Sequence, residues 1–129
     1  MIYIDKPCSH IRHDPFSGCA VLVCKGYFLE SEYREALNRC LDLMHQTKAK
    51  HLIVNLQAAK NECWAENAWT ATEWFPRLVQ TELTRLAIVV ADKPLPSGFV
   101  FQADSDRCIA SRCFDLMEDA YAWMSPENH

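Results

Sequence analysis

The sequence predicts an α/β fold, with a mixed, mostly parallel sheet, an antiparallel hairpin at its N-terminal end and about four helices. Short apolar runs typical of buried strands recur along the chain, amphipathic helical patterns separate them, and a turn signal precedes the first of them. Strands that alternate with helices favour parallel pairing through right-handed crossovers. With 129 residues, the chain is long enough for one hydrophobic core, so we expect a single domain over residues 1–129.

The turn signal is Asp14–Gly18, in which a proline presets φ and Gly18 supplies the positive φ that closes a hairpin. It should join a strand near His10–His13 to a second strand at Cys19–Cys24. Because the second strand is apolar at nearly every position, we expect it to be central and covered on both faces.

A helix is predicted from Leu29 to His45, with Ser31 as a candidate N-cap. Apolar residues recur there at steps of three and four, and oppositely charged side chains are spaced i,i+4 on the solvent side. The apolar stripe consists of Leu29, Tyr33, Ala36, Leu37, Cys40, Leu41 and Met44.

Alternating strands and helices continue after this helix. We predict a strand at His51–Leu56, a helix over residues 64–82 and a further buried strand at Thr84–Ala91. A kink or restart is expected around Thr72–Pro76, because proline lacks an N–H and clashes with the preceding turn.

The last part of the chain should hold a short helix within Ser97–Arg107, a strand at about Ile109–Phe114 and a final helix ending near Met124. Asp115 and Glu118 have the spacing of a capping box, which opens a helix. In that final helix Leu116, Ala120 and Trp123 share one face, which we expect to lie against the sheet.

Three local patterns resemble the bacterial SpoIIAA-like proteins, also called STAS/SEC14-like domains. The resemblance covers about residues 9–124. It is carried by Tyr33-Arg34-Glu35-Ala36-Leu37 on the first long helix, Trp74-Phe75-Pro76-Arg77 on the second, and Phe114-Asp115, Glu118, Ala120 and Trp123-Met124 at the end.

This resemblance implies a small α/β domain used for protein–protein regulation or for binding apolar ligands, with no established chemistry for most members. In the anti-sigma-factor antagonists of the family, a serine after the strand before the second helix is phosphorylated, and that strand often ends in aspartate. Here Asn55 stands near the expected aspartate, and no Ser or Thr occurs between Thr47 and Thr70. We therefore do not expect the phosphorylation switch.

Composition argues against several partners. The formal net charge of −4 disfavours nucleic acid, whose binding modules usually carry a basic face. Neither a signal peptide nor an apolar run of membrane-spanning length is visible, so we expect a cytoplasmic protein without membrane insertion.

The seven cysteines should be reduced and unbridged, because their number is odd and the chain has no C-x-x-C pair. We interpret Cys19, Cys24, Cys40 and Cys113 as small buried hydrophobic residues.

No residue set has the spacing of a known catalytic or metal centre, so we predict no enzyme, no metal and no cofactor. Cys8, His10 and His13 are poorly spaced for zinc, and Asp104–Asp106 lacks the glycine and distal glutamate of a calcium loop. Neither a nucleophile motif nor a glycine-rich phosphate loop is present. Cys63, near the start of a helix, is the thiol whose reactivity is most worth testing.

The candidate binding region follows the His51–Leu56 strand, because ligands of open α/β sheets gather at the carboxyl ends of parallel strands. Trp64 belongs to the core stripe of the following helix, whereas Trp69 and Trp74 lie about 140° and about 80° from its centre, on opposite sides. At least one of them should therefore sit at the rim or in a contact surface. The alternative is that Trp64 is wholly core and the polar residues only cover a turn. The predicted contact residues are Asn55, Gln57, Lys60, Trp64, Trp69 and Trp74.

Three functions follow from these patterns. The first is a non-catalytic regulatory or interaction domain that forms a homodimer or binds another protein through the second-helix region. The second is a carrier of a small apolar ligand held between that helix and the strand ends. The third, and least favoured, is an enzyme that uses Cys63 or the N-terminal Cys/His cluster.

Overall fold

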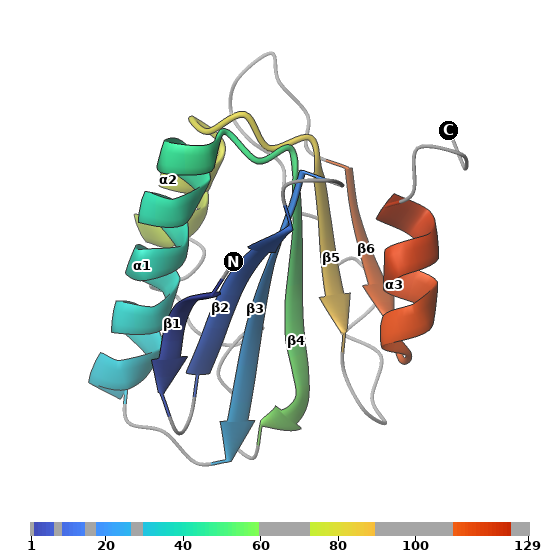
Figure 1. Ribbon diagram of the computed structural model, residues 1–129, viewed down its shortest axis with the longest axis horizontal. Coiled ribbons are helices and arrows are strands. Elements are labelled where there is room, and N and C mark those ends of the chain that lie inside the picture. The colour runs from blue at the N-terminus through green and yellow to red at the C-terminus, as the bar shows by residue number, and fades with distance from the viewer. Residues whose placement is uncertain are drawn as a thin grey trace.

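The computed structural model describes residues 2–6, 9–14, 18–26, 30–59, 73–89 and 110–124. These residues form a six-stranded sheet in the order β1-β2-β3-β4-β5-β6, with helices on both faces (Figure 1). The elements are β1 (Ile2–Lys6), β2 (Ser9–Asp14), β3 (Cys19–Gly26), α1 (Glu30–Thr47), β4 (His51–Ala59), α2 (Phe75–Leu78), β5 (Arg85–Val89), β6 (Ala110–Phe114) and α3 (Met117–Met124).

The sheet is mixed, as the sequence predicts. β1, β2 and β3 pair in antiparallel fashion, and β3, β4, β5 and β6 pair in parallel. Because these parallel strands follow one another in one direction across the sheet, right-handed crossovers place the connecting helices on one face. In Figure 1, α1 and α2 lie on that face, and α3, which follows the last strand, lies on the other.

Two apolar cores result, one on each face, and alternate residues of the same strand contribute to them. In β3, Leu22 and Cys24 belong to the core under α1 and α2, whereas Cys19 and Val21 belong to the core under α3. The predicted central strand is therefore confirmed. None of the described helices is long and apolar enough to cross a membrane.

The hairpin turn forms as expected. Gly18 adopts a φ of 67°, and its N–H donates to the carbonyl oxygen of Asp14 at 2.9 Å. Asp14 is paired with Cys19 in the β2–β3 register. A residue with a Cβ would be strained at this φ, which explains the glycine.

β1 was not predicted from the sequence, and it pairs with β2, which therefore lies between β1 and β3. β1 has five residues, and its pairing with β2 shifts register between Ile2 and Ile4. Such a short strand is stabilised by its neighbour more than by its own propensity, and the local pattern is correspondingly weak.

α1 carries the predicted stripe, whose members from Tyr33 to Met44 are buried. The helix begins at Glu30, so Ser31 lies inside its first turn and is not the N-cap. At the other end Lys48 has a left-handed φ of 55°, and its N–H donates to the carbonyl oxygen of Met44 at 2.9 Å. This geometry is a common way to end a helix.

The second long helix was predicted over residues 64–82, but residues 60–72 lie outside the described part of the chain, as does the short helix expected within Ser97–Arg107. α2 is confined to Phe75–Leu78 and ends before Glu82. Its second residue is Pro76, which agrees with the predicted restart, because first-turn N–H groups have no partner within a helix.

α3 begins at Met117, and the N–H of Ala120 donates to the carbonyl oxygen of Leu116 at 3.3 Å. Leu116 therefore precedes the first turn and is 52% exposed, so its predicted place against the sheet was wrong. The predicted packing of Ala120 and Trp123 is confirmed: Ala120 and Met124 are buried, with Met117 and Trp123 packed beside them.

Candidate functional site

The carboxyl end of β4, where the sequence predicts a binding region, contains a β-bulge. Val23 pairs with Asn55, but the next pair is Lys25 with Ala58, so the register shifts between them. The side-chain oxygen Oδ1 of Asn55 accepts a hydrogen bond from the backbone N–H of Gln57 at 2.9 Å. Such a bond to the backbone two residues on stabilises an irregular strand end.

Gln57 connects this bulge to α3. Its Nε2 donates to the carbonyl oxygen of Asp115 at 2.8 Å, a contact between residues 58 positions apart. The contact places Leu116, the most exposed of the large apolar side chains the structure describes, next to the carboxyl end of β4. The two bonds use the Asn55 oxygen and the Gln57 amino group, which leaves the Asn55 amino group and the Gln57 oxygen for other contacts.

Trp74 is not part of this surface. It is fully buried in the core under α1 and α2, and its indole Nε1 donates to the carbonyl oxygen of Leu37 at 2.8 Å. The expectation that Trp74 flanks the site is corrected: the helical wheel assumed one regular helix over residues 64–82, and α2 begins only at Phe75. Lys60, Trp64 and Trp69 lie outside the described residues, so their part in the site stays a prediction.

On the α3 side of the sheet, the structure brings together an arginine–tryptophan cluster that sequence reasoning missed. The Cζ atoms of Arg85 and Arg112 lie 5.2 Å and 5.7 Å from the ring centroid of Trp123. Arg112 also lies 5.4 Å from the ring of Phe114, and the two rings are 5.7 Å apart. The sequence did contain a signal for this cluster, because Arg85 and Arg112 are charged residues at core-facing positions of predicted strands.

Further polar contacts hold α3 on the sheet. Nη1 of Arg85 donates to the carbonyl oxygen of Trp123 at 2.7 Å, and Nη2 of Arg12, in β2, donates to the hydroxyl of Tyr121. Only two residues of α3 are buried, Ala120 and Met124. Cationic side chains from the sheet therefore contribute to docking this helix alongside apolar packing.

Trp123→Ala is expected to lower the free energy of unfolding by about 1–3 kcal/mol, less than a fully buried tryptophan would cost, because the ring is only half-buried. Urea unfolding followed by circular dichroism measures the loss. Trp123→Phe is the matched control and should retain part of the stability. An alanine variant with an unchanged midpoint would contradict the docking of α3 through this ring.

The prediction of small buried hydrophobic residues is confirmed for Cys19, Cys24 and Cys40, which lie in the cores and are not joined in a disulfide. Burial raises the pKa of Cys19 and of Cys40 to about 12, with smaller contributions from Asp14 and Cys24 respectively. These thiols are therefore protonated and poorly nucleophilic at neutral pH. The side chain of Cys113, like Cys8 and Cys63, lies outside the described part of the chain.

Among the described residues, no three His, Cys, Asp or Glu side chains gather as metal ligands would. In β2, His10 pairs with Val23 and His13 with Ala20. Because residues three apart on a strand point to opposite faces, the two histidines do not converge.

The fold and these sites define the class of the molecule as an α/β domain with a mixed sheet covered on both faces. A scan against protein-family models and searches of curated proteins and of solved structures each found no match for this chain. The resemblance to the SpoIIAA-like family therefore stays a prediction.

Proposed function

We propose that this chain is a non-catalytic regulatory domain that works in the cytoplasm by binding another protein, as the resemblance to SpoIIAA-like domains implies. The proposed contact surface, called here the β4–α3 surface, comprises Asn55, Gln57, Asp115 and Leu116. The hydrogen bond from Gln57 to the carbonyl oxygen of Asp115 carries the proposal, because it joins the predicted binding region to the exposed leucine.

The chemistry of this surface suits a protein interface. A leucine that is 52% exposed can enter a pocket on a partner, and such central apolar anchors supply much of the energy of interfaces. One exposed leucine alone is ordinary for a protein surface. Here it lies beside hydrogen-bonding side chains at the carboxyl end of a parallel strand, where open α/β sheets gather ligands.

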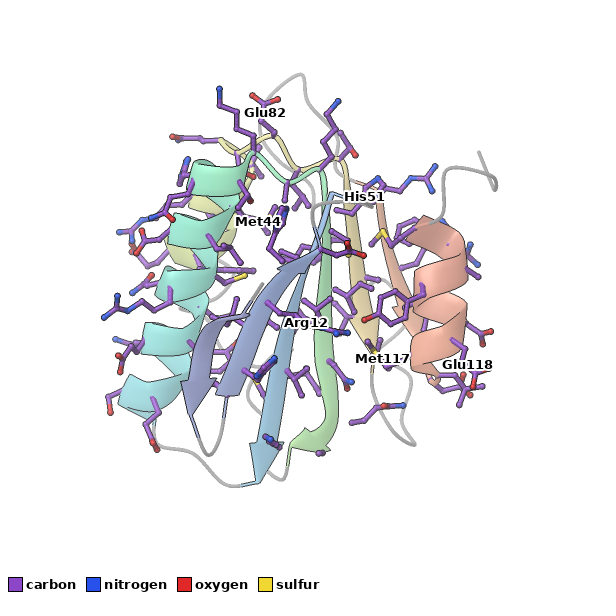
Figure 2. All side chains as sticks on the ribbon, viewed as in Figure 1. Arg12, Met44, His51, Glu82, Met117 and Glu118 are labelled. Carbon is purple, nitrogen blue, oxygen red and sulfur yellow. The ribbon has the colours of Figure 1, made fainter. Side chains whose placement is uncertain are left out.

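Charge indicates what the partner looks like. Asp115, Glu118 and Asp119 are all exposed, and Figure 2 shows Glu118 and Met117 at the end of α3 nearest the tips of the parallel strands. These carboxylates lie within three residues of Leu116 along the chain and give this end of α3 a negative charge. A partner with an apolar pocket bordered by lysine or arginine would complement this surface in shape and charge.

Site-specific photo-crosslinking tests this proposal. A photoreactive amino acid at position 116, in cells that naturally express the chain, should capture a specific protein, whereas the same group at exposed Gln80, beyond α2, should not. Leu116→Arg should weaken binding of the captured protein by about tenfold or more. It should leave the unfolding midpoint nearly unchanged, because the side chain is already exposed. Equal capture at both positions would contradict the proposal.

Native mass spectrometry of gently purified protein separates the alternatives. A dimer that Leu116→Arg disrupts would identify the partner as a second copy of this chain. A retained small molecule would instead favour the carrier of an apolar ligand, and a stoichiometric metal would favour an enzyme.

A further inference from the structure

We infer that Arg85 and Arg112, whose guanidinium groups lie over the ring of Trp123, form a binding site for a dianionic phosphate group on the α3 side of β5 and β6. Arg85 is the first residue of β5, and Arg112 pairs with Ala87 two residues further along the neighbouring strand. Ala87 belongs to the core under α3. Register therefore places both arginines on the α3 side of the sheet.

The ring of Trp123 attracts both guanidinium groups. With their Cζ atoms 5.2 Å and 5.7 Å from one ring centroid, the two cations share a single aromatic partner. A guanidinium attracted to a ring through its positive charge still carries N–H groups that can donate hydrogen bonds to a ligand. Arg85 is fixed further by its bond to the carbonyl oxygen of Trp123, whereas Arg112 is exposed and can approach a ligand.

The balance of charge favours an anion between them. Among the described residues neither guanidinium is paired with a carboxylate, so the two positive charges near this ring have no anionic partner within that part of the chain. A bound dianion would relieve their mutual repulsion and accept paired hydrogen bonds from each fork, the geometry in which arginine binds phosphate best. The C-terminal end of the α3 dipole carries about half a negative charge, which disfavours a bound anion. This charge is smaller than the two formal positive charges of the arginines.

This site is distinct from the β4–α3 surface. Arg85 begins β5 and Arg112 is the third of the five residues of β6, whereas Gln57 lies beyond Asn55, the β4 residue that pairs with the last residue of β5. α3 runs from the tips of the parallel strands back towards their beginnings, so its first and last residues mark the two ends (Figure 1). Loss of one function therefore leaves the other measurable.

Calorimetric titration of the full chain tests the inference, with inorganic phosphate and phenyl phosphate as probes and sodium chloride as the control for ionic strength. Saturable binding of either probe is expected at about millimolar concentration or below. Tighter binding of phenyl phosphate would identify a phosphomonoester as the ligand, and equal or tighter binding of inorganic phosphate would identify the free ion. Absence of saturable binding would overturn the inference.

Matched variants locate the site. Arg112→Gln should weaken phosphate binding by about tenfold or more, and Arg112→Lys should weaken it less, because lysine keeps the charge but loses the fork. Arg77→Gln removes an exposed arginine of α2 on the other side of the sheet and should change affinity by less than about twofold. Equal weakening by Arg112→Gln and Arg77→Gln would mean non-specific attraction and would refute the site.

Discussion

Trp74→Ala is expected to lower the free energy of unfolding by about 3–5 kcal/mol, the usual cost of emptying a tryptophan-sized space in a core. The side chain is 0% exposed, so the whole ring is removed from close packing under α1 and α2. A domain of this size has about 5–15 kcal/mol in all. The variant should therefore lose a large share of its stability, and its midpoint in urea titration followed by circular dichroism should lie well below that of the parent chain.

Trp74→Phe is the matched control. Phenylalanine keeps most of the apolar contact but loses the indole N–H that bonds to the carbonyl oxygen of Leu37. Its expected cost is about 1–2 kcal/mol, the range for one neutral hydrogen bond plus a small loss of packing. An alanine variant as stable as the parent chain would contradict the burial of this ring.

Alkaline pH is expected to destabilise the fold through its buried thiols. Burial raises the pKa of Cys19 and Cys40 from 9.0 to about 12. Above pH 9 the unfolded chain releases these protons while the folded chain keeps them. The unfolded state then binds fewer protons, so the free energy of unfolding falls as pH rises from about 9 to about 12 and is unaffected by these groups below that window.

Within that window each thiol can lower the free energy of unfolding by about 1.4 kcal/mol per pH unit. Urea unfolding at several pH values between 8 and 11 would measure the combined slope. Lysine and tyrosine side chains also titrate in this pH range, but they do so equally in the parent chain and in its variants. The informative comparison is therefore between the pH slope of the parent chain and that of the double variant Cys19→Ala/Cys40→Ala. That variant should be less stable at pH 8 but should have a shallower pH slope, and an identical slope would rule out the thiols as the cause.

The sequence by itself determined the elements whose burial follows a local period. Residues of β3 alternate between the two cores, and α1 buries residues at steps of three and four. Because the exposed and buried faces of such elements are set by position along the chain, the pattern of apolar residues reveals them without knowledge of their neighbours. The turn closed by Gly18 belongs to the same group, since its backbone geometry requires glycine.

The strand that contains Asn55 was also predictable, but its length and the contacts made there were not. The sequence predicts a strand at His51–Leu56 with Asn55 near its end, but β4 runs on to Ala59, so Asn55 lies at its middle and Gln57 in its second half. The partner of Gln57 is 58 residues away in α3. The exposure of Leu116 depends on α3 beginning one residue after it.

Tertiary structure alone decided the place of β1, the burial of Trp74 and the arginine–tryptophan cluster. β1 depends on its pairing with β2, and Trp74 on the packing of α2 against α1 and the sheet. Arg85 donates a hydrogen bond to Trp123, which is 38 positions away in the sequence. Such contacts depend on how separate elements are packed in space, and periodicity within one element carries no information about that packing.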